Sequence, residues 1–152
     1  MKSLALRYIG ALALAVWGLS GAAQAGEPSL LGTWTCDYIV GTPQGNHPAR
    51  LVLVIDRQDG ANFSGTKTWT RLDGSKGESK GAPVSEASEK VLGVIDYDKT
   101  GIHIVEASET GRYVGKLVKA NTLQLVFTDV GPEARAARLT LSREPKNASS
   151  DR

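Results

Sequence analysis

Hydrophobic and polar residues alternate with a period of two through most of the chain after residue 30. Such alternation is typical of β-strands that pack one face on a core and turn the other to solvent. Residues 31–40, for example, place Trp34, Cys36, Tyr38 and Val40 on one face. The pattern predicts eight strands, at residues 31–40, 50–57, 62–71, 90–96, 101–107, 112–119, 122–129 and 134–143.

Short turn sequences separate the predicted strands. Asp59-Gly60 favours a tight hairpin, because Gly accepts a positive φ and Asp hydrogen-bonds to the nearby backbone. Glu109-Thr110-Gly111 and Ala120-Asn121 are similar breaks, and no segment after residue 30 has a convincing helical pattern. Sequential hairpins favour an all-β fold, an eight-stranded antiparallel up-and-down barrel, which also leaves no exposed sheet edge.

Two segments depart from the alternation. Residues 72–89 are rich in Gly, Ser, Lys and Glu and have few apolar side chains, so we expect a mobile loop there. Residues 144–152 are polar, and we expect a disordered tail.

Three of the predicted strands are apolar on both faces, at residues 51–55, 91–95 and 102–105. A barrel strand with a solvated outer face should alternate, so these outer faces need cover. The loop at 72–89, a second copy of the chain or a partner protein could supply it. We favour a homo-oligomer among these three.

The N-terminal segment has the three parts of a secretory signal peptide. Lys2 and Arg7 form a basic start, residues 9–19 are apolar, and Ala23-Gln24-Ala25 matches a cleavage site. The apolar run is shorter than the roughly 20 residues that a membrane-spanning helix needs. We therefore expect residues 1–25 to be removed from a bacterial protein that is periplasmic or secreted, without a membrane span.

Removal of this segment changes the charge balance. The chain has 18 Lys and Arg against 16 Asp and Glu, and Lys2 and Arg7 leave with the signal peptide. The remaining chain is neutral and has no basic run, so we expect no nucleic-acid partner. Its length suits one domain, at residues 26–143. With one cysteine the chain has no internal disulfide framework, and we expect Cys36 to be a small buried side chain.

Motifs for metal or catalytic chemistry are weak. Residues 96–101 match the start of a calcium loop, but Ala107 stands where the closing acidic ligand belongs, so an Asp-rich turn is the better interpretation. His47 and His103 are isolated, and Cys36 lies in no catalytic context. We therefore expect no metal and no cofactor, and we predict that the protein is not an enzyme.

Gly32-Thr33-Trp34 opens the first strand and Arg143 lies near the end of the last. This arrangement resembles the calycins, the superfamily of lipocalins, fatty-acid-binding proteins, avidins and some bacterial metalloprotease inhibitors. The resemblance implies a secreted lipocalin-like barrel in which the side chain of Arg143 covers Trp34. The biotin-binding pattern of avidins is missing, because Cys36 stands where that family has Asn.

Aromatic residues at positions compatible with the barrel interior form the candidate ligand site: Tyr38, Trp69, Tyr113 and Phe127. With the resemblance, they favour a non-catalytic binding protein that holds a small, largely apolar ligand. In the plainer alternative these side chains simply fill a narrow barrel. Two further alternatives remain open: a protein-binding module or inhibitor of a secreted or host hydrolase, and a structural envelope component.

Overall fold

The structure, a computed structural model, describes residues 26–131 and 133–145. The predicted signal peptide and most of the predicted tail lie outside these residues. The described part of the chain forms ten strands: β1 (Gly32–Thr42), β2 (Gly45–Asp59), β3 (Asn62–Arg71), β4 (Gly77–Ser79), β5 (Ala82–Val84), β6 (Glu86–Ile95), β7 (Gly101–Glu106), β8 (Arg112–Lys119), β9 (Thr122–Asp129) and β10 (Arg135–Arg143).

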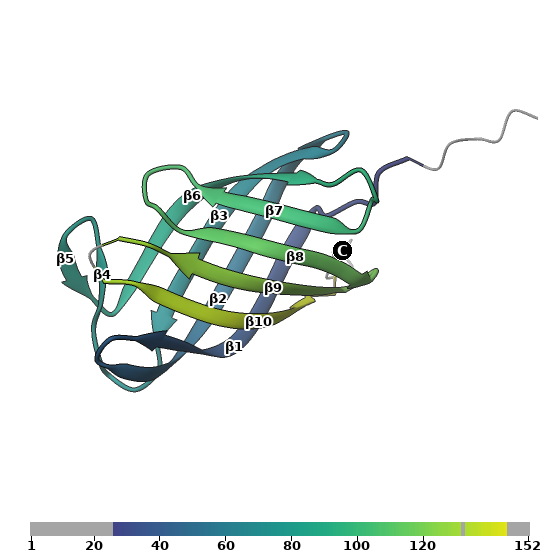
Figure 1. Ribbon diagram of the computed structural model, residues 1–152. Helices are drawn as coiled ribbons and strands as arrows, with labels where there is room; N and C mark the ends of the chain where they lie inside the picture. The colour runs from purple at the N-terminus through teal and green to yellow at the C-terminus, as the bar shows by residue number, and fades with distance from the viewer. Residues whose placement is uncertain (1–25, 132, 146–152) are drawn as a thin grey trace, which may run out of the picture.

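Eight of the strands form a closed barrel in the order β1-β10-β9-β8-β7-β6-β3-β2 (Figure 1). Every neighbouring pair is antiparallel, and β1 closes the ring against β10. The predicted all-β up-and-down barrel is therefore confirmed. The described residues contain no helix, and so none that could cross a membrane.

The alternation in the sequence decides which side chains enter the barrel. In β1, Trp34 and Val40 are buried and Cys36 and Tyr38 pack against the core, as expected. In β9, Leu123, Leu125 and Phe127 point inward between exposed neighbours. Burial of these side chains, worth about 1.5–3 kcal/mol for each large apolar group, supplies most of the driving force for closure.

Glycines allow neighbouring strands to approach closely at two bends. A Cβ at Gly65 would lie 1.9 Å from the carbonyl oxygen of Val54, and one at Gly115 would lie 1.9 Å from that of Gln124. Register shifts occur near both, at Ile55/Arg57 and Leu117/Lys119. The glycines in these strands thus mark barrel bends, as glycines inside strands often do.

The chain before β1 covers one end of the barrel, which we call the Trp34 end. Leu30 is fully buried there and accepts a hydrogen bond of 2.9 Å at its carbonyl from the Trp34 indole. Arg143 lies over the Trp34 ring, 4.3 Å from its centroid. The contact that the resemblance implied between these two side chains is therefore present.

Residues 72–89, predicted to be a loop, contain regular structure instead. β4 and β5 pair as a two-stranded hairpin, and β6 already begins at residue 86. The two central turn residues, Lys80 and Gly81, both have positive φ, as a type I′ hairpin turn requires. The composition predicted a loop because a hairpin this short has few residues that face the core. Only Gly77 and Val84 of the hairpin are seen to pack inward.

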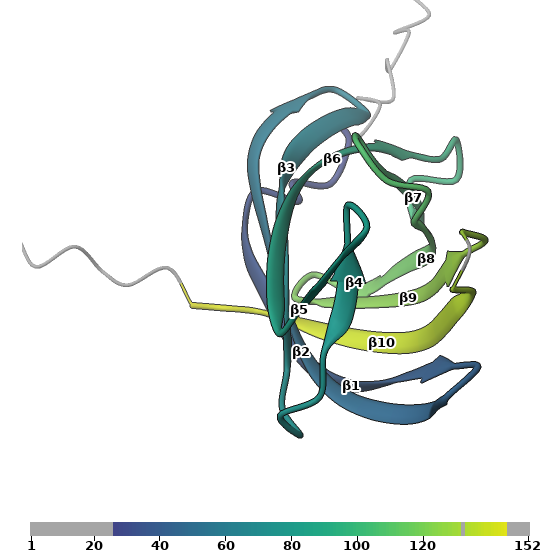
Figure 2. The same cartoon turned by 90° about the vertical axis from the view of Figure 1, so that its left-hand side faces the viewer.

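This β4–β5 hairpin lies across the barrel at the end opposite Trp34. Figure 2 views the molecule from this side, and β4 and β5 stand in front of the ring of strands. We call this end the hairpin end. Both openings of the barrel are thus covered, one by the N-terminal segment and the other by the hairpin.

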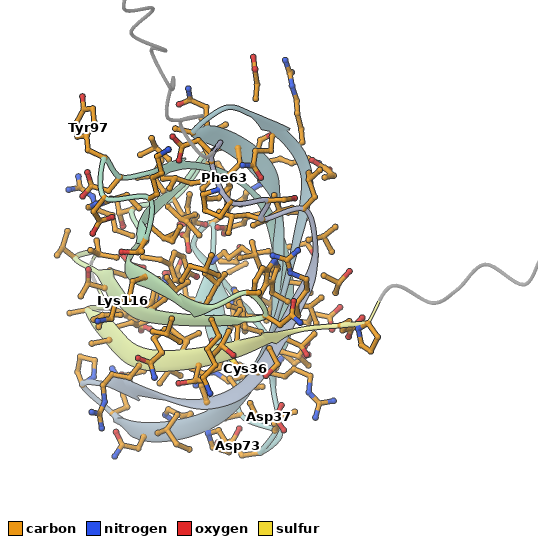
Figure 3. All side chains as sticks on the ribbon, turned by 90° about the vertical axis from the view of Figure 1, so that its right-hand side faces the viewer. Cys36, Asp37, Phe63, Asp73, Tyr97 and Lys116 are labelled. Atoms are coloured by element: carbon orange, nitrogen blue, oxygen red, sulfur yellow. The ribbon has the colours of Figure 1, made fainter. Side chains whose placement is uncertain are left out.

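The outer face keeps several apolar side chains in solvent. Leu92 is 56% exposed and lies opposite Val105 in the β6–β7 pairing, while Val114 and Val126 are paired on β8 and β9. The hairpin covers the barrel end and leaves this face open. Figure 3 shows the contrast between Phe63, inside the ring of strands, and Tyr97, which projects from it. Association with a second copy stays a prediction.

Candidate functional site

The charged groups of the barrel interior gather at the hairpin end. Antiparallel pairing brings the ends of β3, β7 and β9 beside the starts of β6, β8 and β10. The Trp34 half of the interior is apolar, whereas the hairpin half holds the buried or largely buried charged residues Lys67, Arg71, Glu89, Glu106, Asp129 and Arg135. Buried charges are costly unless they are paired, so each needs an explanation.

Lys67 forms the centre of one charged cluster. Its ammonium group pairs with the carboxylate of Glu106 and lies 3.3 Å from Oε2 of Glu89. The Tyr113 hydroxyl donates a hydrogen bond of 3.2 Å to Glu106. The same ammonium lies 5.9 Å from the ring centroids of Tyr113 and Phe127, within reach of a cation–π interaction.

Protonation at this cluster depends on Glu89. Burial, together with the nearby Glu106 carboxylate, raises the pKa of Glu89 to about 7, although the Lys67 ammonium opposes the shift. Burial and the neighbouring Glu106 charge also raise the pKa of Tyr113 well above its usual value. Tyr113 is therefore a neutral hydrogen-bond donor near neutral pH, while Glu89 exchanges a proton there.

Arg135 belongs to a second, fully paired cluster. Its guanidinium pairs with Asp129, which also accepts a hydrogen bond from the Thr110 hydroxyl. These hydrogen bonds lower the pKa of Asp129 against the opposing effect of burial. Nη1 of Arg135 donates a hydrogen bond of 3.0 Å to the carbonyl oxygen of Glu78, so this residue links β10 to the hairpin.

Arg71, in contrast, is buried with no anion hydrogen-bonded to its Nε or Nη1 among the described residues. Its side chain is at the end of β3, and the residue is 9% exposed. Among the described residues, Nε and Nη1 of its guanidinium have no hydrogen-bond partner. Burial lowers the pKa of Arg71 below its usual value, but a guanidinium stays charged at any physiological pH. The site therefore contains unused donors on a permanent cation.

All four predicted site residues meet at this end of the barrel. Tyr38, Trp69, Tyr113 and Phe127 line a single cavity, together with Val40, Ala49, Lys67, Arg71 and Arg135. Tyr113 and Phe127 also contact each other, with ring centroids 4.8 Å apart. Trp69 comes from β3 and Tyr38 from β1, so four different strands position the aromatic groups.

The cavity is small in the present conformation. Its volume of about 30 Å³ holds about two water molecules. A pocket for a drug-sized molecule is typically about 300 Å³ or more. Most of the barrel interior is filled by side chains, as the plainer alternative expected, and a larger ligand needs space that the hairpin now covers.

Contacts between the hairpin and the barrel are few and identifiable. Gly77 packs so closely on Trp69 that a Cβ would lie 2.8 Å from the indole ring. Arg135 donates a hydrogen bond to the carbonyl oxygen of Glu78, and the Lys80 amide donates a hydrogen bond of 2.8 Å to the Glu109 carboxylate. The hairpin does not itself line the cavity, but its Gly77 packs on Trp69, which does, and the hairpin is not part of the barrel ladder.

The aromatic residues that line this cavity were predicted from the sequence, whereas its charged residues were not. The missing signal was strand parity: Lys67 and Arg71 have the same parity as Phe63 and Trp69, and Glu106 has that of Ile102 and Ile104. Charged side chains at inward positions of otherwise apolar strands would have indicated a polar interior.

A larger hollow, of about 570 Å³, lies on the outer surface over β8, β9 and β10. The surrounding Val114, Val126 and Arg138 are exposed. No buried polar group without a partner lies there among the described residues. The interior cavity is therefore the better candidate site.

Other sequence candidates have local structural roles. Asp98 accepts hydrogen bonds from the amides of Thr100 and Gly101, at 2.8 and 2.7 Å, which confirms the Asp-rich turn. Within residues 26–131 and 133–145, no three His, Cys, Asp or Glu side chains gather as metal ligands would. Cys36 is a free, partly buried thiol, and burial raises its pKa to about 11.

Comparisons with known proteins show no family for this chain. No family model matches the sequence, and no curated protein matches it. A redesigned β-barrel is 16% identical with a TM-score of 0.46, and the alignment covers 76% of this chain and 92% of that one. A de novo designed fluorescence-activating β-barrel is 10% identical with a TM-score of 0.45, and the alignment covers 75% of this chain and 93% of that one.

Proposed function

We propose that this chain is an exported, non-catalytic binding protein that holds a small ligand with a largely apolar body at the hairpin end of its barrel. The observation that supports the proposal most directly is the convergence of Tyr38, Trp69, Tyr113 and Phe127 on one cavity. Binding sites commonly combine such an aromatic lining with a few polar groups. Membership of the calycins is part of the proposal, supported by the contact of Arg143 with Trp34.

Ligand entry in this proposal requires movement of the hairpin. The cavity of about 30 Å³ is roughly a tenth of the volume of a typical ligand pocket. The hairpin is anchored through Gly77, Glu78 and Lys80, outside the eight-stranded ladder. It can therefore move while the barrel stays closed, and its displacement uncovers the face of Trp69.

Native mass spectrometry of the mature protein, purified from the envelope or medium of its own cells, tests the proposal. We expect a reproducible added mass of a few hundred daltons that is lost on denaturation. Ala49→Val supports the assignment of the site, because Ala49 lines the cavity and the added methyl groups fill it. This variant should remain folded and lose the added mass.

Ala137→Val is the matched control, since Ala137 is also buried in the barrel wall but does not line the cavity. It should retain the added mass. A bare mass for the natural protein would contradict the proposal and favour the protein-binding alternative. Equal retention of the ligand by Ala49→Val and Ala137→Val would place the ligand elsewhere.

A further inference from the structure

The charges around Arg71 are distributed unevenly. Four carboxylates of this region already have partners: Glu106 and Glu89 pair with Lys67, Asp129 pairs with Arg135, and Asp73 binds His47 and Ser75. The charges of Asp73 and Glu133 act on Arg71 through space, without accepting a hydrogen bond from its Nε or Nη1. Within the described chain, Nε and Nη1 of Arg71 are left without an acceptor. The barrel thus neutralises its other interior cations and leaves this guanidinium unsatisfied.

An unsatisfied buried guanidinium is unfavourable. A buried donor without an acceptor loses the hydrogen bonds it made to water, and the loss is larger for a charged group. A buried Lys can avoid this cost by losing its proton and becoming neutral, but Arg cannot. An acceptor from outside the chain removes this penalty, and an anion also compensates the charge. Carboxylates match guanidinium donors in both shape and charge.

A cavity lies beside Arg71, and its unpaired Nε and Nη1 atoms, which have almost no accessible surface now, become available to a head group when the hairpin that packs near Nε moves. The cavity of about 30 Å³ that Arg71 lines takes about two water molecules, which is close to the size of one carboxylate. Tyr38 lines the same cavity, and burial raises the pKa of its hydroxyl to about 12, so it remains a possible donor to an anion. Trp69 and Phe127 provide the adjoining aromatic wall, which suits an apolar group attached to the carboxylate.

We propose that the ligand of this barrel is an organic carboxylate whose anionic group binds the Arg71 guanidinium beneath the β4–β5 hairpin, with its apolar part against Trp69. This inference rests on the proposed function and adds the chemical class of the ligand. It also gives the interior cations different roles: Lys67 and Arg135 are internally paired, and Arg71 recognises the ligand.

Three probes with one body and different head groups test the inference: 3-phenylpropanoate, 3-phenylpropanamide and 3-phenylpropylamine. Titrations of the ¹⁵N-labelled mature protein are followed at the Arg71 Nε–H and Trp69 indole N–H resonances, at constant ionic strength. We expect saturable shifts with the carboxylate, at least about 10-fold weaker binding of the amide, and weaker binding still of the amine.

Variants assign the effect to the guanidinium. Arg71→Gln should lower the affinity for the carboxylate to that for the amide and leave amide binding unchanged. Arg71→Lys, which keeps the charge, should recover part of the difference. Arg50→Gln is the matched control, because Arg50 is exposed and pairs with Asp37 on the surface. It should bind the carboxylate as the natural protein does.

Formate separates the inference from the proposed function. If formate shifts the Arg71 resonance and no phenylpropyl probe binds, the anion site stands and the apolar-ligand function fails. If the amide binds as tightly as the carboxylate, or Arg71→Gln and Arg71→Lys bind the carboxylate normally, the inference is overturned and the function stands. If neither formate nor any probe shifts Arg71 or Trp69, both are overturned.

Discussion

Arg143 lies over the indole ring of Trp34, with its guanidinium 4.3 Å from the ring centroid, at the end of the barrel opposite the hairpin. The same guanidinium donates hydrogen bonds to the carbonyl oxygens of Ser29 and Leu31, at 2.6 and 3.3 Å. One side chain therefore covers the tryptophan and fixes the segment that closes this end.

Arg143→Gln should lower the free energy of unfolding by about 1–2 kcal/mol, because it removes a cation–π contact and charged hydrogen bonds. Arg143→Lys should lower the free energy of unfolding less, since it keeps a cation near the ring. Urea denaturation of the mature protein measures both. Arg138→Gln, on the exposed face of the same strand, is the control. Equal stability of Arg143→Gln and Arg138→Gln would show that the contact contributes nothing.

Arg71 and Arg135 should respond in opposite ways to the same substitution. Arg71→Met removes an unsatisfied buried cation, so the free energy of unfolding of the ligand-free protein should stay equal or rise. Arg135→Met leaves Asp129 buried without its cation and should cost about 3 kcal/mol. Urea midpoints of the two variants, measured side by side, check this contrast. A large loss for Arg71→Met would mean that Arg71 has a stabilising partner in the ligand-free protein.

Glu89 should make the protein less stable as the pH rises towards neutral. Its pKa is about 7 in the folded protein, against an ordinary value of 4.5. Between these values the folded protein holds a proton that the unfolded chain has released, so the free energy of unfolding falls with rising pH. The contribution is complete below about pH 4.5 and is lost as the pH passes 7.

Glu89→Gln has no proton to lose at this position. Relative to the natural protein, it should therefore become progressively more stable between pH 5 and 7, because the titration of the other groups is common to both chains. Chemical denaturation at several pH values measures the difference. A difference that does not change with pH would contradict the raised pKa of Glu89.

Gly65→Ala should be among the most damaging small substitutions in the barrel. The new Cβ would lie 1.9 Å from the Val54 carbonyl oxygen, and backbone atoms of a paired strand cannot yield as a flexible side chain can. We expect a loss of about 3 kcal/mol. Gly41→Ala is the matched control, since its Cβ would meet atoms no closer than 3.4 Å. Thermal unfolding of both variants checks the expectation, which fails if they melt together.

The sequence was sufficient to predict the barrel because most of its strands alternate between inward apolar and outward polar residues. Strands such as β9 alternate strictly, and hairpin turns such as Asp59-Gly60 separate them, so their number and order followed from local pattern. The pattern failed at β4 and β5, each of which is three residues long. Two inward residues are too few to produce a recognisable period, and the type I′ turn at Lys80-Gly81 lacks the usual Asn or Asp before Gly.

The same reasoning predicted only some of the residues of the candidate site. Aromatic residues such as Trp69 stand out among inward positions. Arg71 shares their strand parity, but parity alone does not show that a charged side chain at the end of a strand is buried, and Glu89 falls in the segment that composition predicted to be a loop. Their burial depends on long-range pairing, for example of Lys67 with Glu89 across β3 and β6. Local patterns do not contain that information, and neither does the fact that Arg71 lacks an acceptor.

Closure of β1 on β10 affects how the chain folds into the barrel. Trp34 and Arg143, which face each other across that seam, come from opposite ends of the described chain. Until β10 is in place, β1 presents an open edge that can pair with another unfinished molecule. The β9–β10 hairpin thus protects the open edge of the β1–β2 hairpin, and a chain truncated before β10 should be a template for aggregation.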